Sequence, residues 1–224
     1  MADEVDHLGA LLAHPNRPFI AILGGSKVSG KLDVIENLLE RVDTLLIGGA
    51  MAYTFFKAQS LPIGTSLVEP ELLDATDRIV HRAQECGVQL RLPSDHIVAE
   101  RIEVGAPCET LTVSDVTIGD RIGIDIGPQT RSVYASDIRS AQTVMWNGPM
   151  GVFEIDEFAE GTMAVAHAVA ESVATSVVGG GDSIAAVTKA GVTDQITHIS
   201  TGGGASLEFL AGRILPGVNA LPDL

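Results

Sequence analysis

Short apolar runs alternate along this chain with segments in which apolar residues recur at helical spacing. Buried strands are predicted at residues 18–23, 44–47, 88–92, 143–146, 175–178 and 197–200. Helices are predicted at residues 3–13, 31–41, 51–56, 70–86, 130–140 and 158–171, with a last helix before residue 197. Strands that alternate with helices indicate a mainly parallel sheet covered on both faces. The predicted fold class is α/β: a three-layer α/β/α, Rossmann-like domain.

Residues 93–127 depart from this alternation because Val, Ile, Thr, Gly and Pro are mixed there without helical spacing. Such a composition is typical of strands and turns. We therefore predict a small insertion of irregular hairpins in the α/β domain.

Glycines follow five of the predicted strands, at Gly24-Gly25, Gly48-Gly49, Gly148, Gly179–Gly181 and Gly202–Gly204. In an open parallel sheet, ligands bind at the carboxyl ends of the strands. Tight turns favour glycine by themselves, but they also accept Asn, Asp or Ser. The five glycine positions together indicate a ligand that lies close to the main chain along one rim of the sheet, the edge formed by the carboxyl ends of its strands.

Composition limits the classes of function that fit. The 224 residues, 46% of them hydrophobic, suffice for one large domain with a buried core. No apolar run approaches the ~20 residues that span a bilayer, and the first residues are acidic, unlike a secretory signal. Cys86 and Cys108 are too few for a disulfide framework, so reduced thiols in the cytoplasm are expected. The net charge of −15 makes nucleic acid and anionic membranes poor partners.

Two of the glycine runs carry polar side chains suited to a nucleotide. Each follows a strand and opens a helix, which presents free N–H groups and a positive dipole end to a phosphate. Lys27 and Lys31 in the first run add positive charge, and Asp182 in the second suits Mg²⁺. The pattern indicates a nucleotide-binding, phosphoryl-transferring domain.

Other interpretations of these motifs remain open at this stage. Residues 25–32 match the P-loop pattern except at Leu32, which stands where Ser or Thr would ligate magnesium. Neither later glycine run completes a dinucleotide fingerprint, because Ile184 and Leu207 replace its third glycine. Lys27 and Lys31 also fit solvated lysines at a helix start, and Asp182 fits an ordinary N-cap.

Several segments, in order, resemble the C-terminal half of phosphoglycerate kinase: FIAILGGSKVSGKL, LLIGGAMAYTF, VMWNGPMGVFE, VVGGGDSIAA and HISTGGGASLEFLAG. The resemblance runs from about Glu4 to the C-terminus and implies ATP or ADP with Mg²⁺ as the bound nucleotide. It also implies a division into residues 1–16, a helix that bridges two domains, and residues 17–224, the nucleotide-binding domain. The family's N-terminal domain, with its basic patch for 3-phosphoglycerate, is not in the chain.

The resemblance also implies roles for single residues. Lys27 resembles the lysine that follows the transferred phosphoryl group, and Lys31 the lysine that holds the nucleotide phosphates. Asp182 resembles the ligand of Mg²⁺. Gly203, within the last glycine run, resembles the helix start that faces the phosphoacyl substrate. The expected catalytic residues are thus Lys27, Lys31 and Gly203, and the expected metal ligand is Asp182.

The rest of the nucleotide site follows from the same resemblance. Asn147 lies near the phosphates, Glu154 bonds the ribose hydroxyls and Pro149 lies beside the sugar. The adenine slot and the remaining phosphate contacts are assigned to Gly25, Ser26, Gly48, Gly49, Leu67, Ile124, Gly180, Gly181 and Ser183. His96 departs from the aromatic or apolar residue that the family often has near the base.

The implied reaction is phosphoryl transfer between 1,3-bisphosphoglycerate and ADP in glycolysis, without a covalent enzyme intermediate. Half of the positive surroundings of the phosphates then belongs to the absent domain. The chain alone is expected to bind nucleotide without turnover, and the full enzyme to be a monomer. The alternatives are a P-loop hydrolase or kinase and a stand-alone module that binds nucleotide or a partner without catalysis.

Overall fold

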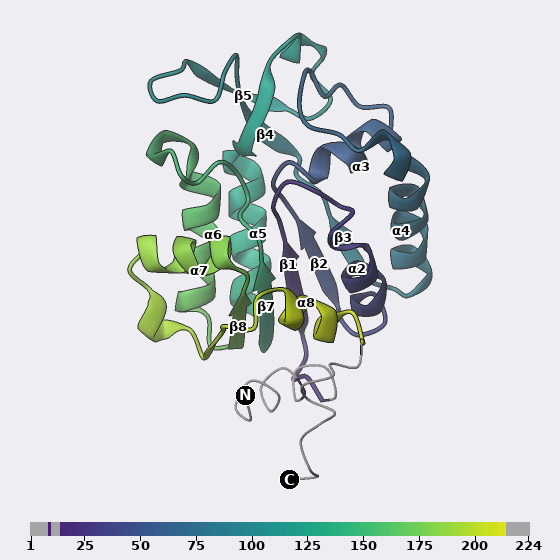
Figure 1. Ribbon diagram of the computed structural model, residues 1–224, viewed down its shortest axis with the longest axis vertical. Coiled ribbons are helices and arrows are strands. Elements are labelled where there is room, and N and C mark those ends of the chain that lie inside the picture. The colour runs from purple at the N-terminus through teal and green to yellow at the C-terminus, as the bar shows by residue number, and fades with distance from the viewer. Residues whose placement is uncertain (1–8, 10–13, 214–224) are drawn as a thin grey trace.

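The computed structural model describes residue 9 and residues 14–213 and places a six-stranded parallel sheet at its centre (Figure 1). The strands lie in the order β3-β2-β1-β7-β8-β9. Their bounds are β1 Phe19–Leu23, β2 Thr44–Ile47, β3 Gln89–Arg91, β7 Thr143–Asn147, β8 Thr175–Gly179 and β9 His198–Ser200. The strand order reverses between β1 and β7, so the sheet has a switch point there.

Helices cover both faces of this sheet, which confirms the predicted three layers (Figure 1). One face carries α2 Leu32–Leu38, α3 Ala52–Ala58, α4 Leu73–Glu85 and α8 Gly204–Leu210. The other face carries α5 Pro128–Ser140, α6 Glu160–Glu171 and α7 Gly181–Lys189. Single 3-10 turns are η1 Pro70–Leu72, η2 Val116–Ile118, η3 Asp156–Phe158 and η4 Thr193–Gln195.

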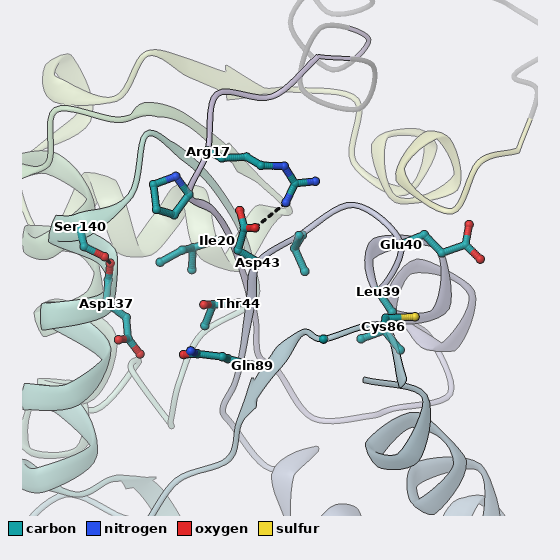
Figure 2. A pocket seen from close by; sticks show the side chains of 13 residues that line it. Arg17, Ile20, Leu39, Glu40, Asp43, Thr44, Cys86, Gln89, Asp137 and Ser140 are labelled. Carbon is teal, nitrogen blue, oxygen red and sulfur yellow. Dashed lines mark hydrogen bonds and ion pairs between the residues drawn. The ribbon is translucent and has the colours of Figure 1, made fainter. Parts of the chain in front are cut away.

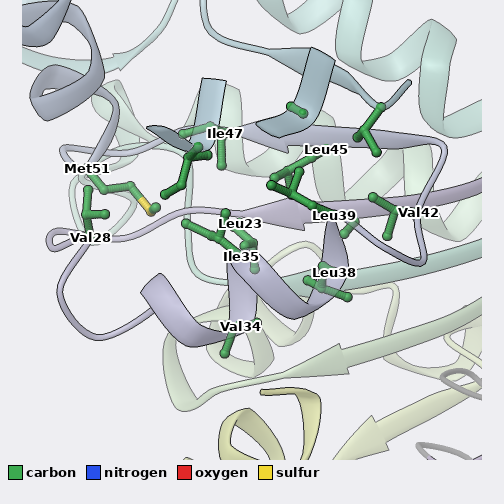
Figure 3. Packing of buried hydrophobic residues seen from close by; sticks show 14 of the residues in the cluster. Leu23, Val28, Val34, Ile35, Leu38, Leu39, Val42, Leu45, Ile47 and Met51 are labelled. Atoms are coloured by element: carbon green, nitrogen blue, oxygen red, sulfur yellow. The ribbon is translucent and has the colours of Figure 1, made fainter. Parts of the chain in front are cut away.

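Strand β1 shows why the apolar runs lack polar positions. Its side chains alternate between two cores: Phe19, Ala21 and Leu23 face the first, whereas Ile20 and Ile22 face the second. Both faces of a central parallel strand are buried, so every position is apolar. The first core extends beyond the sheet to the loop after β1, because it includes Val28 (Figure 3).

The insertion at residues 93–127 is more regular than predicted. It forms a three-stranded antiparallel sheet in the order β5-β4-β6, with β4 at Asp95–Ala99, β5 at Cys108–Thr112 and β6 at Ile122–Ile126. The central strand β4 pairs with a strand on each side, and the register shifts between Ile97 and Val98. Such pairing joins residues far apart in sequence, which a local pattern does not reveal.

Several helix boundaries differ from the predictions. Helix α2 begins at Leu32 and ends at Leu38 instead of running over 31–41, and the predicted helix at 70–86 begins as the 3-10 turn η1 at Pro70. Helix α6 begins at Glu160, after the turn η3. The predicted helix at 3–13 lies outside the described residues, except for residue 9. Within the described part, no helix is long and apolar enough to cross a membrane.

Candidate nucleotide site

The five strands that precede glycines end side by side. One row of register partners runs across the sheet through Ile47, Leu23, Asn147, Gly179 and Ser200. Each is the last residue of its strand, so the turns that follow share one rim. The common rim predicted from the glycine positions is confirmed.

At the switch point the main chains of three turns touch directly. The Gly24 N–H donates to the Asn147 carbonyl at 3.0 Å, and the Gly25 N–H donates to the Pro149 carbonyl at 2.8 Å. A Cβ at Gly24 would lie 2.1 Å from the Pro149 oxygen, and one at Gly48 would lie 2.4 Å from the Met150 sulfur. Close packing therefore requires glycine at these two positions, whether or not a ligand also requires it.

Two neighbouring cavities open along this rim. The first, of about 300 Å³, is called here the lysine cavity. Its lining residues are Gly25, Ser26, Lys27, Gly30, Lys31, Asn147, Gly148, Pro149, Gly180, Gly181, Asp182, Ser183 and Leu207. It brings together both candidate lysines, the candidate metal ligand and the start of α7, which are far apart in sequence.

The second cavity, of about 280 Å³, is called here the aromatic cavity. Its lining residues are Gly25, Ser26, Gly49, Ala50, Ala52, Tyr53, Phe56, Pro93, His96, Gly123, Ile124, Asp125, Ile126, Pro149, Met150, Gly151, Val152, Glu154 and Asp182. Gly25, Ser26, Pro149 and Asp182 line both cavities. An elongated ligand with a flat apolar end and an anionic end fits such a pair.

Three predicted site residues line neither cavity. Gly48 is buried beneath Met150. Leu67, predicted as a wall of the adenine slot, is 46% exposed. Gly203 precedes α8 in a left-handed conformation, with φ at 55°, and Leu207 of that helix reaches the lysine cavity instead. The other predicted residues line one cavity or both.

Lys31 is not the solvated side chain that its position at the start of α2 would allow. Its ammonium group donates to the Gly24 carbonyl at 2.5 Å and lies 3.4 Å from the Asn147 carbonyl oxygen. Burial lowers the pKa of Lys31 to about 8, although the nearby Asp182 carboxylate acts in the opposite direction. A partly desolvated ammonium beside an open cavity is suited to bind an anion.

Polar groups of β7 and α7 face each other in the lysine cavity. The side-chain amide nitrogen of the buried Asn147 has no hydrogen-bond partner among the described residues. Ser183 is fully buried, and its hydroxyl oxygen accepts the Gly148 N–H at 2.5 Å. The Ser183 hydroxyl thus supports the turn after β7. Asn147, in contrast, offers a donor that a ligand acceptor would satisfy.

Comparison with known proteins decides the family. The family model described as "Phosphoglycerate kinase" matches residues 1–213 of the chain. The chain belongs to the phosphoglycerate kinase family. It is 57% identical over 224 residues to the phosphoglycerate kinase of Chlorobium limicola, covering 98% of this chain and 56% of that protein. The relative from Leptospira biflexa is 56% identical, with 99% and 56% covered.

Solved structures show the same likeness. The phosphoglycerate kinase of Coxiella burnetii has a TM-score of 0.94 and 47% identity, covering 97% of this chain and 56% of that one. The enzyme of Pyrococcus horikoshii has a TM-score of 0.84 and 38% identity, with 99% and 56% covered. The chain therefore spans about half the length of the phosphoglycerate kinases that it matches.

The family implies a magnesium ion at the nucleotide site, so side chains of the rim should be able to hold one. Among the described residues, no group of three or more His, Cys, Asp or Glu side chains could hold a metal ion. Asp182, exposed in the first turn of α7, offers a single carboxylate. The N-cap position of that helix is Gly180, so Asp182 does not serve as the N-cap. One carboxylate fits Mg²⁺, which is usually bound through one or two carboxylates plus substrate phosphates and water.

Sequence reasoning missed two buried polar side chains in the wall of the aromatic cavity, Tyr53 and Asp125. The Tyr53 hydroxyl lies 2.7 Å from His96 Nδ1, and the two rings stack at 5.8 Å. Burial lowers the pKa of His96 to about 4, so its imidazole is neutral at pH 7. Burial also raises the pKa of Asp125 to about 7, although the Gly161 N–H donates to its carboxylate at 2.6 Å. No local sequence signal distinguishes Asp125 from a surface acid.

A larger cavity of about 980 Å³ lies at the amino ends of β1, β2 and β3, opposite the glycine rim (Figure 2). Arg17 and Asp43 form an ion pair at 2.5 Å on its wall. None of the predicted site residues lines this cavity. Size alone therefore does not identify the functional site of this family member.

Proposed function

We propose that this chain is the ATP- and ADP-binding, C-terminal half of a phosphoglycerate kinase. Joined to a domain that binds 3-phosphoglycerate, it transfers a phosphoryl group between 1,3-bisphosphoglycerate and ADP in glycolysis, in the cytoplasm. One observation carries the proposal. The lysine cavity brings Lys27, Lys31, Asp182 and Asn147 together at the switch point of the sheet. The Asn147 amide nitrogen has no hydrogen-bond partner in the part of the chain that the structure describes.

The two cavities divide the nucleotide between them. Adenine occupies the aromatic cavity beside Ile124 and Gly49, and the exposed Glu154 carboxylate accepts hydrogen bonds from the ribose hydroxyls. The phosphates enter the lysine cavity. Pro149, which lines both cavities, lies beside the sugar at their junction.

Catalysis in this proposal consists of positioning and charge neutralisation. Lys31 binds the nucleotide phosphates with a partly buried ammonium, while the exposed Lys27 follows the group in transfer. Asp182 would hold Mg²⁺, which supplies positive charge on the phosphate oxygens when bound. The Asn147 amide donates to a phosphate oxygen. The last glycine turn, with Gly203, faces the acyl-phosphate substrate.

In this proposal a second domain supplies about half of these positive surroundings. The chain's net charge of −15 opposes the approach of phosphorylated substrates. In the proposed enzyme the other domain supplies the basic surface, and closure of the two domains excludes water. Nucleotide binding without turnover is the expected behaviour of the isolated chain.

This proposal is tested by titrating the chain with ADP and excess magnesium in a calorimeter and by a coupled assay of phosphoryl transfer. Binding without turnover is expected, and a separately produced N-terminal half of a close relative should restore turnover. Absence of binding would refute the proposal, and robust turnover by the chain alone would refute its dependence on a second domain. Binding that never leads to turnover would favour a stand-alone nucleotide-binding module.

Replacing the proposed metal ligand, Asp182→Ala, is expected to abolish the gain in ADP affinity that magnesium provides. The physical reason is that a phosphate-bound Mg²⁺ loses its one carboxylate ligand from the protein. Calorimetry with and without magnesium measures this gain. Asp194→Ala removes the same charge at an exposed position away from both cavities and serves as the control. If Asp182→Ala keeps the full gain in ADP affinity from magnesium, the Asp182 carboxylate does not bind the metal. Its role would then be limited to a favourable interaction with the dipole of α7.

A further inference from the structure

A buried carboxylate from outside the rim holds the loop that carries both lysines. Glu69 lies between α3 and η1 and is 9% exposed. Its Oε2 accepts the Val28 N–H at 2.6 Å and the Ser29 N–H at 3.1 Å. Although Glu69 stands at the N-cap of η1, its side chain makes no capping hydrogen bond there. The carboxylate is therefore committed to the loop, 40 residues earlier in the sequence.

Glu69 is itself fixed from the opposite side. Its backbone N–H donates to the hydroxyl oxygen of Thr54, a buried residue of α3, at 3.2 Å. Burial alone would raise the pKa of the Glu69 carboxyl, but the hydrogen bonds from Ser29 and Val28 outweigh it and lower that pKa. Glu69 thus stays ionised at neutral pH, and hydrogen bonds to a charged acceptor are the stronger ones.

Val28 transmits this anchor to both lysines. Its side chain is fully buried in the first core, near Met51 in Figure 3. Its N–H is held by Glu69, and its carbonyl accepts the Lys31 N–H at 2.8 Å. Lys27 is the residue directly before Val28, with an exposed side chain that lines the lysine cavity. The backbone of Lys27 is therefore attached to a fixed point, and its exposed side chain extends along the lysine cavity.

We propose that Glu69 is a positioning residue, which anchors the loop after β1 so that Lys27 and Lys31 face the phosphates of a bound nucleotide. This inference rests on the proposed nucleotide-binding function. Glu69 does not touch the ligand, because it lines neither the lysine cavity nor the aromatic cavity. It acts through the N–H groups of Val28 and Ser29, and its carboxylate also interacts with the Ser29 side chain and with the charge of Lys27.

Two conservative variants separate the reach of this side chain from its charge. Glu69→Asp keeps the charge but withdraws the acceptor by about 1.5 Å, the length of one carbon–carbon bond. Glu69→Gln keeps the reach and an acceptor oxygen but loses the charge. If anchoring is the role, Glu69→Asp should weaken binding of ADP with magnesium by about tenfold, and Glu69→Gln by less than about threefold.

Adenosine distinguishes positioning from a general loss of structure. Adenosine fills only the aromatic cavity, so its affinity should stay within about twofold of the native value in both variants. Glu71→Asp shortens an exposed carboxylate in the same turn, η1, and should leave the affinities for ADP and adenosine unchanged. Thermal unfolding and binding are measured on the same samples.

Specific outcomes would overturn the inference. Native ADP affinity in Glu69→Asp would show that the anchor is not needed. An equal loss of ADP and adenosine affinity would show a structural role, and an equal loss in Glu69→Gln and Glu69→Asp would show that reach does not matter. If the native chain binds no ADP, both the proposed function and the role of Glu69 are refuted. If the native chain binds ADP and the Glu69 variants bind it equally well, only the role of Glu69 is refuted.

Discussion

Replacing Gly49 with alanine is expected to lower the free energy of unfolding by about 4 kcal/mol, because two costs add. Gly49 has φ at 68°, where a Cβ is strained by about 1–2 kcal/mol. The added Cβ would also lie 2.5 Å from the Gly25 oxygen and 2.9 Å from the Pro149 oxygen. Both are main-chain atoms of the switch point and cannot rotate away.

Gly181→Ala is the matched control, since Gly181 belongs to the same rim and is also a predicted nucleotide contact. A Cβ there meets nothing within 4 Å, and no positive φ is required. Thermal unfolding should place Gly49→Ala roughly 10 °C below the native chain and Gly181→Ala within about 3 °C of it. Equal melting temperatures for the two variants would mean that the crowding at Gly49 is relieved by small backbone shifts.

Much of the fold was predictable because the signal was local. A central strand such as β1 is buried on both faces, so its apolar run identifies it without knowledge of its neighbours. Five glycine turns after such strands were enough to predict a common rim. The order of the strands is different: the reversal between β1 and β7 depends on contacts between residues 19–23 and 143–147, which no single segment encodes.

The candidate site was predicted only where a residue's role is written in its own motif. Asn147 and Asp182 stand in recognisable runs, and both line the lysine cavity. Glu69 was missed because its partners lie about 40 residues away, and an acid before a proline resembles an ordinary helix start. Ser183 also lines the lysine cavity, and its motif did not reveal that its hydroxyl accepts the Gly148 N–H.

The lowered pKa of Lys31 predicts a second large effect, a fall in the affinity for ADP as the pH rises. In the free chain burial lowers this pKa to about 8, so at pH 9.5 most Lys31 side chains are neutral. A bound phosphate offsets the desolvation and returns the pKa toward its usual value near 10.5. Because the bound state then holds a proton that the free state has lost, affinity for ADP falls as the pH rises above 8.

We expect the affinity for ADP with magnesium to fall roughly twentyfold between pH 7.5 and 9.5, with proton uptake that grows over the same interval. Calorimetry in two buffers of different ionisation enthalpy measures both quantities. Above pH 7.5 the ADP phosphates are already ionised, so they contribute little to the slope. Lys31→Arg keeps its charge throughout this range, so its own affinity for ADP should change less than about twofold between pH 7.5 and 9.5. If Lys31→Arg and the native chain show the same dependence of affinity on pH, Lys31 does not bind the phosphates. The exposed Lys27 would then be the lysine proposed to bind them.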